Sequence, residues 1–179
     1  MSEIWQKAAS FAARAHGEQL RKDDETPYIA HPFRVTMTIR DVFEVDDTNI
    51  LAAALLHDTI EDTTTDYDVV HEEFGPAIAS LVAALTKDMR LPEDRREKEY
   101  MKQLKEAPWQ ARLVKLADVY DNLADSPSAS MEKRSILKAK EVLQLAETGE
   151  PELVQAASEL EKLIQEYEKL LKQPMTNDE

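Results

Sequence analysis

The chain has 179 residues, of which 36 are acidic and 22 basic, and its formal net charge is −14. That charge argues against nucleic acid or an anionic membrane as the main partner, because both need a positively charged face. The lack of cysteine excludes disulfides, zinc–thiolate sites and a thiol nucleophile. No stretch approaches the roughly 20 apolar residues of a membrane span, so we expect a cytoplasmic protein.

Helical periodicity runs through almost the whole chain, and its three glycines are too few for a fold built from tight turns. Apolar residues three or four apart predict a first helix over residues 3–17. A polar loop ends at Pro27, and Pro32 then lies in the first turn of a second helix. A third, buried helix is predicted to be capped by Asp47 or Thr48 and to run on through residue 62.

The second half of the chain continues the helical pattern. Gly75 is predicted to stop a short fourth helix, and Pro76 to open the next one, which runs to about Lys87. The remaining helices are expected over 92–106, 109–125, 130–147 and 151–172. The sequence therefore predicts a single all-α helical bundle over 1–173, followed by a disordered tail over 174–179.

The last predicted helix has a heptad-like apolar pattern. Six residues form it: Leu153, Ala156, Leu160, Leu163, Tyr167 and Leu170. Packing on the domain's own core and a homodimer seam both fit this spacing. We favour the first interpretation, because three heptads are the minimum for a coiled coil.

Four polar residues are predicted to form a metal site. His31 opens the second helix, His57 and Asp58 follow the apolar run of the third, and Asp118 lies in an otherwise apolar helix. A buried, unpaired carboxylate is costly, and a cation is its usual partner. Two imidazoles and two carboxylates suit Mn²⁺, with Fe²⁺ or Zn²⁺ as alternatives. Such a site leaves positions open for water and substrate.

The stretch LLHDTIEDTTT, residues 55–65, places further acidic residues beyond the histidine. On a continuous helix His57 and Glu61 share one face, as do Asp58 and Asp62, since each pair is four residues apart. Glu61 and Asp62 are therefore predicted to reach the attacking water and the leaving oxygen.

Two other histidines are interpreted as structural. His71 is expected on a solvated helix face. His16 is expected at a helix end, with a place in the pocket as the alternative.

The ordered set of two histidines and two aspartates resembles that of the HD-domain metal phosphohydrolases. Three stretches resemble the hydrolase domain of RelA/SpoT proteins, and above all the stand-alone small alarmone hydrolases, including the metazoan SpoT homologs: AHGEQLRKDDETPYIAHPFRV, ILAAALLHDTIEDTTTDYDVVHEEFG and ARLVKLADVYDNL. The resemblance covers residues 3 to about 125, and more weakly to about 170. It implies an HD-domain helical bundle and a Mn²⁺-dependent 3′-pyrophosphohydrolase that converts (p)ppGpp to GDP or GTP and pyrophosphate.

The resemblance also assigns roles to residues. It implies four metal ligands, which are His31, His57, Asp58 and Asp118. Glu61 and Asp62 would handle the water and the proton. The nucleotide would meet Arg21, Lys22 and Asn122, and the weaker candidates for its phosphates are Lys87, Arg90, Arg112, Lys133 and Arg134.

The sequence departs from the family pattern at two positions. Val119 replaces a residue that is usually basic, and Asp121 replaces an aromatic residue or histidine. Both changes are expected to make the far wall of the pocket less positive and to weaken the choice between bases, so an adenine alarmone, (p)ppApp, is an alternative substrate. Local arginines and lysines must then offset the overall negative charge near the pocket mouth.

Two further readings stay open. One is a general HD nucleotidase or phosphatase acting on nucleoside monophosphates or NADPH-like 2′-phosphates. The other is a catalytically inactive HD module that binds a nucleotide or a partner. An inactive module should have lost a metal ligand or the acidic pair Glu61 and Asp62, and all of these residues are present.

Overall fold

The computed structural model describes residues 3–126, 128–147 and 149–172, and the predicted tail over 174–179 lies outside these ranges. In chain order the helical elements are α1 (Ile4–His16), α2 (Ala30–Met37), the π-helical turn η1 (Thr38–Val42), α3 (Thr48–Leu56), α4 (Thr59–Asp62), α5 (Tyr67–Leu85), α6 (Glu93–Glu106), α7 (Trp109–Ala124), α8 (Ala129–Val142), the 3₁₀ turn η2 (Leu143–Ala146) and α9 (Pro151–Lys172). Across the described ranges, strand-type pairing is limited to one isolated bridge between Leu20 and Pro27. The predicted all-α fold is confirmed.

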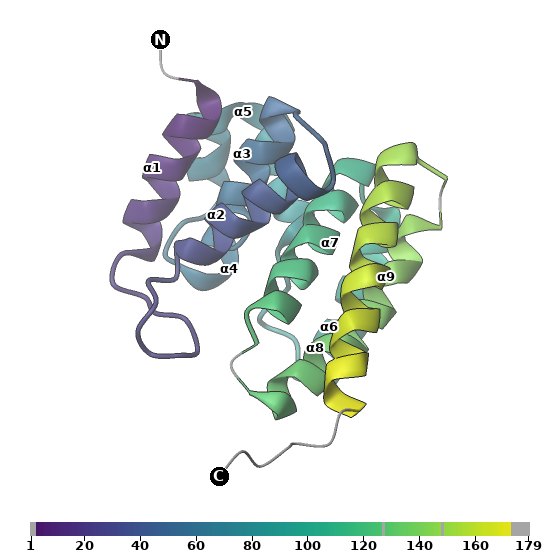
Figure 1. Cartoon of the computed structure of the whole chain (residues 1–179). Helices are drawn as coiled ribbons and strands as arrows, with labels where there is room; N and C mark the ends of the chain where they lie inside the picture. The colour runs from purple at the N-terminus through teal and green to yellow at the C-terminus, as the bar shows by residue number, and fades with distance from the viewer. Residues whose placement is uncertain (1–2, 127, 148, 173–179) are drawn as a thin grey trace.

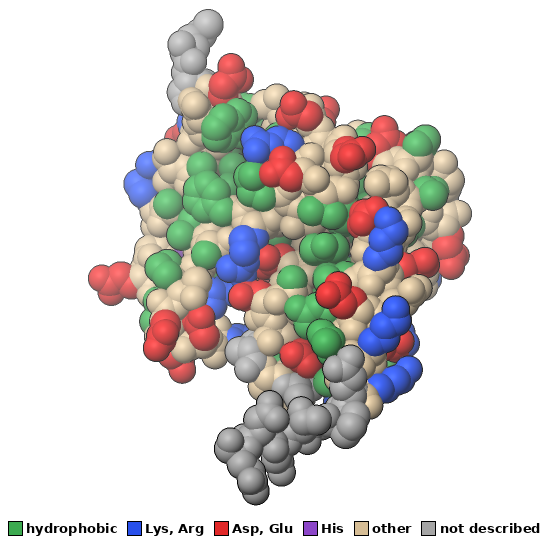
Figure 2. Space-filling view, in the orientation of Figure 1, with side chains coloured by type: hydrophobic (Ala, Val, Ile, Leu, Met, Phe, Trp, Pro, Cys, Tyr) green, Lys and Arg blue, Asp and Glu red, His purple; other side chains and the backbone are tan. Residues whose placement is uncertain are grey.

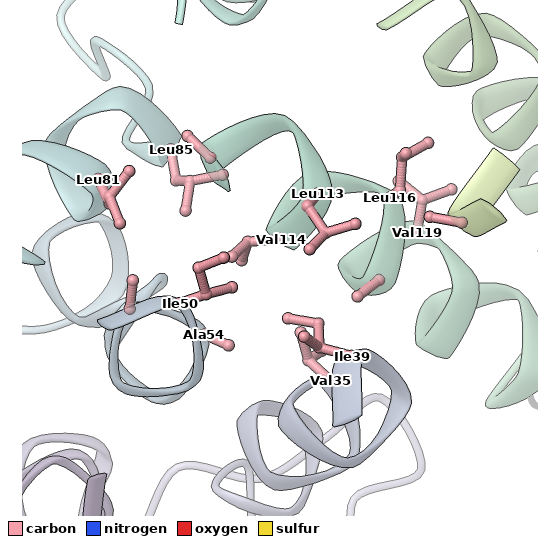
Figure 3. Close-up of a cluster of buried hydrophobic side chains, with 14 of the residues drawn as sticks. Val35, Ile39, Ile50, Ala54, Leu81, Leu85, Leu113, Val114, Leu116 and Val119 are labelled. Carbon is pink, nitrogen blue, oxygen red and sulfur yellow. The ribbon is translucent and has the colours of Figure 1, made fainter. Parts of the chain in front are cut away.

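Helix α7 is the central element of the bundle. It contacts α2, α3 and α5 on one side and α8 and α9 on the other, with α6 also packed against it; Figure 1 shows α7 between these two groups. Its side chains Leu113, Val114 and Leu116 are fully shielded from solvent. In Figure 3 Val114 lies beside Ile50 from α3, whereas Leu116 lies beside Val119 on another side of α7. A polar side chain on α7 is therefore held in an environment where it needs a partner.

The third predicted helix is in fact two helices. α3 ends at Leu56, and Asp58 has φ −98° and ψ −3° before α4 begins at Thr59. His57 Nδ1 lies 2.7 Å from the Ala54 carbonyl, and the Thr59 hydroxyl donates to the Leu56 carbonyl at 2.7 Å. These side chains occupy carbonyls that a continuing helix would use. The expectation of one continuous helix through residue 62 is therefore wrong. Asp58 and Asp62 nevertheless lie on one side of α4, because the Asp62 N–H donates to the Asp58 carbonyl at 2.9 Å and both carboxylates contact the Tyr28 hydroxyl.

Other helix ends agree with the sequence. The Asp47 side chain accepts the backbone N–H groups of Asn49 and Ile50, as expected for the cap of α3. Within α5, Gly75 has φ 81° and ψ 169°, which interrupts the helix just before Pro76. The predicted break is thus confirmed, because a positive φ of this kind favours glycine.

The heptad-like pattern of α9 is used inside the domain. Leu153, Ala156 and Leu160 are fully buried, and α9 contacts α7, α8 and η2. Leu170, in contrast, is 54% exposed. Packing on the domain's own core accounts for the pattern, and a homodimer stays a prediction.

The surface mixes both signs of charge. On the face shown in Figure 2, acidic and basic side chains are interspersed, and hydrophobic side chains gather over α1 and α2. Trp5, Phe33 and Met37 are among the exposed apolar residues of these two helices. Over the described part of the chain, every helix is too short or too polar to cross a membrane.

Candidate metal centre and its cavity

The loop between α1 and α2 brings His31 to the site. Asp23 shapes it by accepting the backbone N–H groups of Glu25 and Thr26 at 3.0 and 2.9 Å. Such a turn is typical of aspartate. His31 follows in the first turn of α2 and is 1% exposed. Its Nε2 faces α7, where Asp118 Oδ1 lies 3.2 Å away.

His57 is oriented by the end of α3. Its Nδ1 lies 2.7 Å from the Ala54 carbonyl, which can only accept, so Nδ1 carries the proton and donates. The other ring nitrogen, Nε2, is fully buried and makes no well-aligned hydrogen bond, although it lies within ion-pair distance of a carboxylate. Asp58 Oδ2 lies 3.0 Å from this nitrogen and 3.7 Å from His31 Nε2. A buried nitrogen without a hydrogen bond is costly, and it marks a position where a ligand would be stabilising.

Asp118 supplies the third side of the centre from α7. One oxygen, Oδ1, faces the two histidines, at 3.2 Å from His31 Nε2 and 4.0 Å from His57 Nε2. The other, Oδ2, accepts from Lys115 Nζ at 2.6 Å. The Asn122 side-chain amide also donates to Oδ1. Burial alone would raise the pKa of Asp118, yet Lys115 and His31 hold it well below the usual range. The carboxylate is therefore ionised.

These residues fit a divalent metal. One ligand atom each from His31, His57 and Asp118 lies within 4.8 Å of the others, and all three residues are buried. Asp58 adds a second carboxylate beside both imidazoles. Neutral imidazole nitrogens and ionised carboxylates are the donors that a borderline or hard divalent ion takes. The metal-free cluster must instead rely on protonated histidines. Burial lowers the pKa of His57, but Asp58 and Asp118 raise it more, to about 9.

Tyr28 joins the metal cluster to α4. Its hydroxyl donates to Asp58 Oδ2 at 2.6 Å and lies 3.1 Å from Asp62 Oδ2. Burial and the nearby Asp58 charge raise the pKa of both Tyr28 and Asp62. The ring of Tyr28 stacks on His16, whose Nδ1 is 2.9 Å from Gln19. Tyr28 therefore keeps its proton, and Asp62 holds its own more readily than an ordinary aspartate.

Glu61, the other acidic residue of α4, contacts Lys87 in the chain after α5. Glu61 Oε2 accepts the backbone N–H of Lys87 at 2.9 Å, and its Oε1 is 3.9 Å from Lys87 Nζ. Glu61 and Asp62 thus make their hydrogen bonds to different segments, and both line the cavity.

A cavity of about 910 Å³ opens above the cluster. That volume lies in the range of small-molecule sites, about 300–1,000 Å³. Six basic residues line it, which are Arg21, Lys22, Lys87, Lys115, Arg134 and Lys138. Seven acidic residues do so as well, which are Asp23, Asp58, Glu61, Asp62, Glu93, Asp118 and Asp125. The lining is therefore nearly balanced in a strongly acidic chain, and a bound divalent cation would make it net positive.

The predicted nucleotide-binding residues divide into two groups. Those that line the cavity are Arg21, Lys22, Asn122, Lys87 and Arg134. Arg90, Arg112 and Lys133 do not. Arg112 is 8% exposed and donates to the Leu145 carbonyl, and the side chain of Arg90 is 89% exposed and paired with Asp88. Lys133 lies on the exposed face of α8. These three residues are not part of the cavity lining, and their expected contacts with phosphate stay predictions.

The position predicted for the Asp121 side chain is wrong. Asp121 is not part of the cavity wall but is 4% exposed, and its carboxylate lies 2.6 Å from His31 Nδ1 and 2.6 Å from Arg34 Nε. Of the two departures from the family pattern, only Val119 lines the cavity, and it is 4% exposed. The expected direct effect of Asp121 on the base therefore has no structural basis.

The histidines outside the cluster lie as interpreted from the sequence. His16 ends α1 and is buried but is not part of the cavity lining, and His71 is exposed.

Three contributors were missed at the level of the sequence. Lys115 precedes Asp118 by three residues on one helix, a spacing that brings side chains together, so a helical wheel could have found it. Tyr28 stands three residues before His31, in a loop whose conformation the sequence does not reveal. Lys138 reaches the cavity from α8, where it bonds Glu97 at 2.7 Å, and only the tertiary fold brings it there.

Two histidines and two aspartates from three segments, beneath an open cavity, form a candidate site for a divalent cation in an all-helical domain. An HD-domain family model matches residues 8–145. The chain belongs to the HD-domain family, and the resemblance seen in its motifs is confirmed.

Relatives within the family are similar over most of the chain. Guanosine-3′,5′-bis(diphosphate) 3′-pyrophosphohydrolase MESH1 from Xenopus tropicalis is 40% identical over 141 residues, which cover 78% of this chain and 79% of that protein. The Homo sapiens protein of the same name is 45% identical over 120 residues, covering 66% and 67%.

Solved structures agree with the fold. A metazoan ortholog of SpoT that hydrolyzes ppGpp superposes with a TM-score of 0.81 at 28% identity, covering 93% of this chain and 96% of that one. A protein from Listeria monocytogenes shares the fold, with a TM-score of 0.62 at 23% identity and coverage of 78% and 99%.

Proposed function

We propose that this protein is a Mn²⁺-dependent hydrolase that removes the 3′-pyrophosphate of ppGpp-like alarmones, giving GDP or GTP and pyrophosphate. The single observation that carries the proposal is the convergence of the buried Nε2 of His57, which makes no well-aligned hydrogen bond, with His31, Asp58 and Asp118 at the base of the cavity. The names of the MESH1 relatives supply the substrate class.

The reaction sets demands on the site. In this hydrolysis a water oxygen joins the phosphorus, the bond between phosphorus and the 3′ oxygen breaks, and that oxygen takes up a proton. A divalent ion held by His31, His57, Asp58 and Asp118 would supply Lewis-acid polarisation and shield phosphate charge. The chain itself must position the water, deliver the proton and bind the phosphates.

Asp62 is the candidate for proton delivery. Burial and the nearby Asp58 charge raise the pKa of its carboxyl group, which favours the protonated form that a general acid needs. The Tyr28 hydroxyl, 3.1 Å away, fixes its orientation. Glu61 is the candidate for positioning the attacking water. The Lys87 N–H holds its Oε2, whereas Oε1 lies 3.9 Å from Lys87 Nζ, which is longer than a hydrogen bond, so this oxygen can accept from a water.

Basic residues around the rim would bind the phosphates and the base. Lys22, Lys87 and Arg134 line the cavity and offer point charges to the phosphates. The Arg21 guanidinium stands 5.7 Å from the centre of the Tyr28 ring and is hydrogen-bonded to Asn122 and Asp125. It is thus held as a flat surface on which a base could stack.

Three further attributes belong to the proposal. The mixed nitrogen and oxygen donors are compatible with Mn²⁺, and Fe²⁺ or Zn²⁺ are the alternatives. The cytoplasm is the expected compartment because the proposed substrate is a nucleotide. A homodimer is an accompanying expectation, and it bears on none of the residues above.

The deciding experiment uses purified protein that has been stripped of metal and reloaded with Mn²⁺. Its activity is measured on ppGpp, ppApp, NADPH and nucleoside monophosphates. We expect pyrophosphate and GDP from ppGpp, separated by anion-exchange chromatography, and no product from the His57→Ala variant. His71→Ala, an exposed histidine outside the cavity, is the matched control and should keep full turnover.

Other outcomes discriminate among the alternatives. Preferential turnover of ppApp would move the proposal to the adenine alarmone. Release of inorganic phosphate from NADPH or a monophosphate alone would identify a different HD phosphatase. A protein that binds these nucleotides and turns over none of them would be an inactive binding module, and the proposal would be wrong.

A further inference from the structure

Asp121 forms a buried bridge between α7 and α2. Its Oδ2 lies 2.6 Å from His31 Nδ1, and its Oδ1 accepts from Arg34 Nε at 2.6 Å. His31 and Arg34 are three residues apart on α2, so both reach the same carboxylate. Asp121 is likewise three residues after Asp118 on α7. One helix turn thus carries both a candidate metal ligand and the partner of a second candidate ligand.

The contact with Asp121 decides which nitrogen of His31 is free. An ionised carboxylate can only accept, so His31 Nδ1 must carry a proton and donate it. In the neutral ring the lone pair then lies on Nε2, the nitrogen that faces Asp58 and Asp118. A hydrogen bond from the second ring nitrogen to a carboxylate fixes both tautomer and ring orientation in metal sites.

Arg34 holds the Asp121 carboxylate in place. Its Nε donates to Oδ1 and its Nη2 to Oδ2 at 3.1 Å, a two-point contact that fixes the plane of the carboxylate. Arg34 also donates to Asp125, which in turn bonds Arg21. The paired donors of the guanidinium favour the charged carboxylate of Asp121.

We propose that Asp121 is a positioning residue for the metal centre, which acts through His31 by holding its Nε2 toward the cation, with Arg34 as the clamp that orients Asp121. The role rests on the metal site of the proposed function. It explains why an aspartate can stand where the family pattern has an aromatic residue or histidine: the side chain is directed at a ligand and not at the base.

The test measures Mn²⁺ affinity of metal-free protein by isothermal titration calorimetry. Asp121→Asn keeps the shape of the side chain but brings an amide that can donate to Nδ1 and favour the wrong tautomer. We expect its dissociation constant to rise by about 10- to 100-fold, the usual effect of losing such a partner. Asp121→Ala should behave alike. Asp125→Asn is the matched control, because Asp125 bonds the same Arg34 without touching His31, and its dissociation constant should change less than about threefold.

A spectroscopic readout separates positioning from general loss of structure. In Zn²⁺-loaded, ¹⁵N-histidine-labelled protein, long-range ¹H–¹⁵N spectra should show His31 protonated at Nδ1, and Asp121→Asn should lose or mix this form. The signals of His57, whose Nδ1 bonds a backbone carbonyl, should stay unchanged. Unaltered His31 signals in the variant would overturn the role even if affinity fell.

The experiments distinguish an incorrect role for Asp121 from an incorrect metal site. If wild-type protein binds Mn²⁺ and Asp121→Asn binds it equally well, only the positioning role is wrong. If Asp125→Asn weakens binding as much as Asp121→Asn, the effect belongs to the charge network and the specific role is also wrong. If wild-type protein binds no Mn²⁺, both the metal centre and the role fall together.

Discussion

Lys115 Nζ donates to Asp118 Oδ2 at 2.6 Å, and both side chains are about nine-tenths buried. The lysine neutralises the aspartate from behind while the opposite oxygen faces the histidines. Asp118 therefore has one permanent cationic partner, and the candidate metal would be the second. This arrangement lets the bundle fold around a buried carboxylate before any ion binds.

Lys115→Met should therefore destabilise the metal-free protein strongly. Removing one partner of a buried pair leaves an uncompensated charge, which costs about 3–5 kcal/mol of unfolding free energy. Chemical denaturation of metal-free protein measures the loss. Mn²⁺ should restore more stability in the variant than in the wild type, because the ion replaces the missing charge. Lys138→Met, which breaks a half-exposed pair with Glu97 at the same cavity, should cost no more than about 1 kcal/mol. Equal losses in the two variants would contradict this account.

Metal affinity should increase with pH. Burial lowers the pKa of His57 while Asp58 and Asp118 raise it to about 9, above the ordinary 6.5. In metal-free protein the charged ring therefore stabilises the fold fully below about pH 6.5, and that contribution is lost as the pH rises through about 9. A cation needs the neutral ring, so protons compete with it across this window.

The expected slope is up to about tenfold in Mn²⁺ affinity per pH unit for each displaced proton. Calorimetric titrations at about pH 6.5, 7.5 and 8.5, repeated in buffers of different ionisation enthalpy, count the protons released. His71→Gln should keep the slope, since His71 is exposed and outside the cavity. An affinity that does not change with pH would sink the prediction.

The acidic pair of α4 should affect turnover more than binding. Asp62→Asn and Glu61→Gln should each lower kcat by about 10²- to 10⁴-fold, the usual contribution of a positioned acid or base. Glutamine is preferred over alanine at 61 because its oxygen can still accept the Lys87 N–H. Steady-state kinetics and Mn²⁺ titration are measured together, and metal affinity should stay near wild type. Asp68→Asn, an exposed aspartate on α5, serves as control. Wild-type kcat in both variants would show that other groups handle the water and proton.

Arg21 and Arg90 make a matched pair for substrate binding. Arg21 lines the cavity, whereas the Arg90 side chain is 89% exposed and pairs with Asp88 away from it. Arg21→Ala should raise KM for ppGpp by about tenfold or more, since charge-assisted hydrogen bonds are worth about 1.5–3 kcal/mol. Arg90→Ala should leave KM unchanged. Initial rates over a range of ppGpp concentrations test both, and a larger effect at Arg90 would reverse the assignment.

The local sequence determined the helices and the identity of the metal-site candidates. Hydrophobic periodicity predicted an all-α bundle. The capping aspartate and the Gly-Pro pair predicted the start of α3 at Asp47 and the break at Gly75, because both features depend on short-range hydrogen bonding and backbone geometry. His31, His57, Asp58 and Asp118 could be selected because polar residues in apolar helices need a partner. Their chemistry is local even though their meeting place is not.

Only the tertiary structure decided how these residues meet and which others join them. The turn at His57 and Asp58 depends on side chains competing for the last carbonyls of α3, which periodicity does not register. The direction of Asp121 depends on α2 packing against α7, so a residue expected in the cavity wall became the partner of His31. Arg112 was separated from the cavity for the same reason, because its side of α7 faces η2. Contacts between distant segments are set by how helices pack, and a single sequence carries no direct record of that.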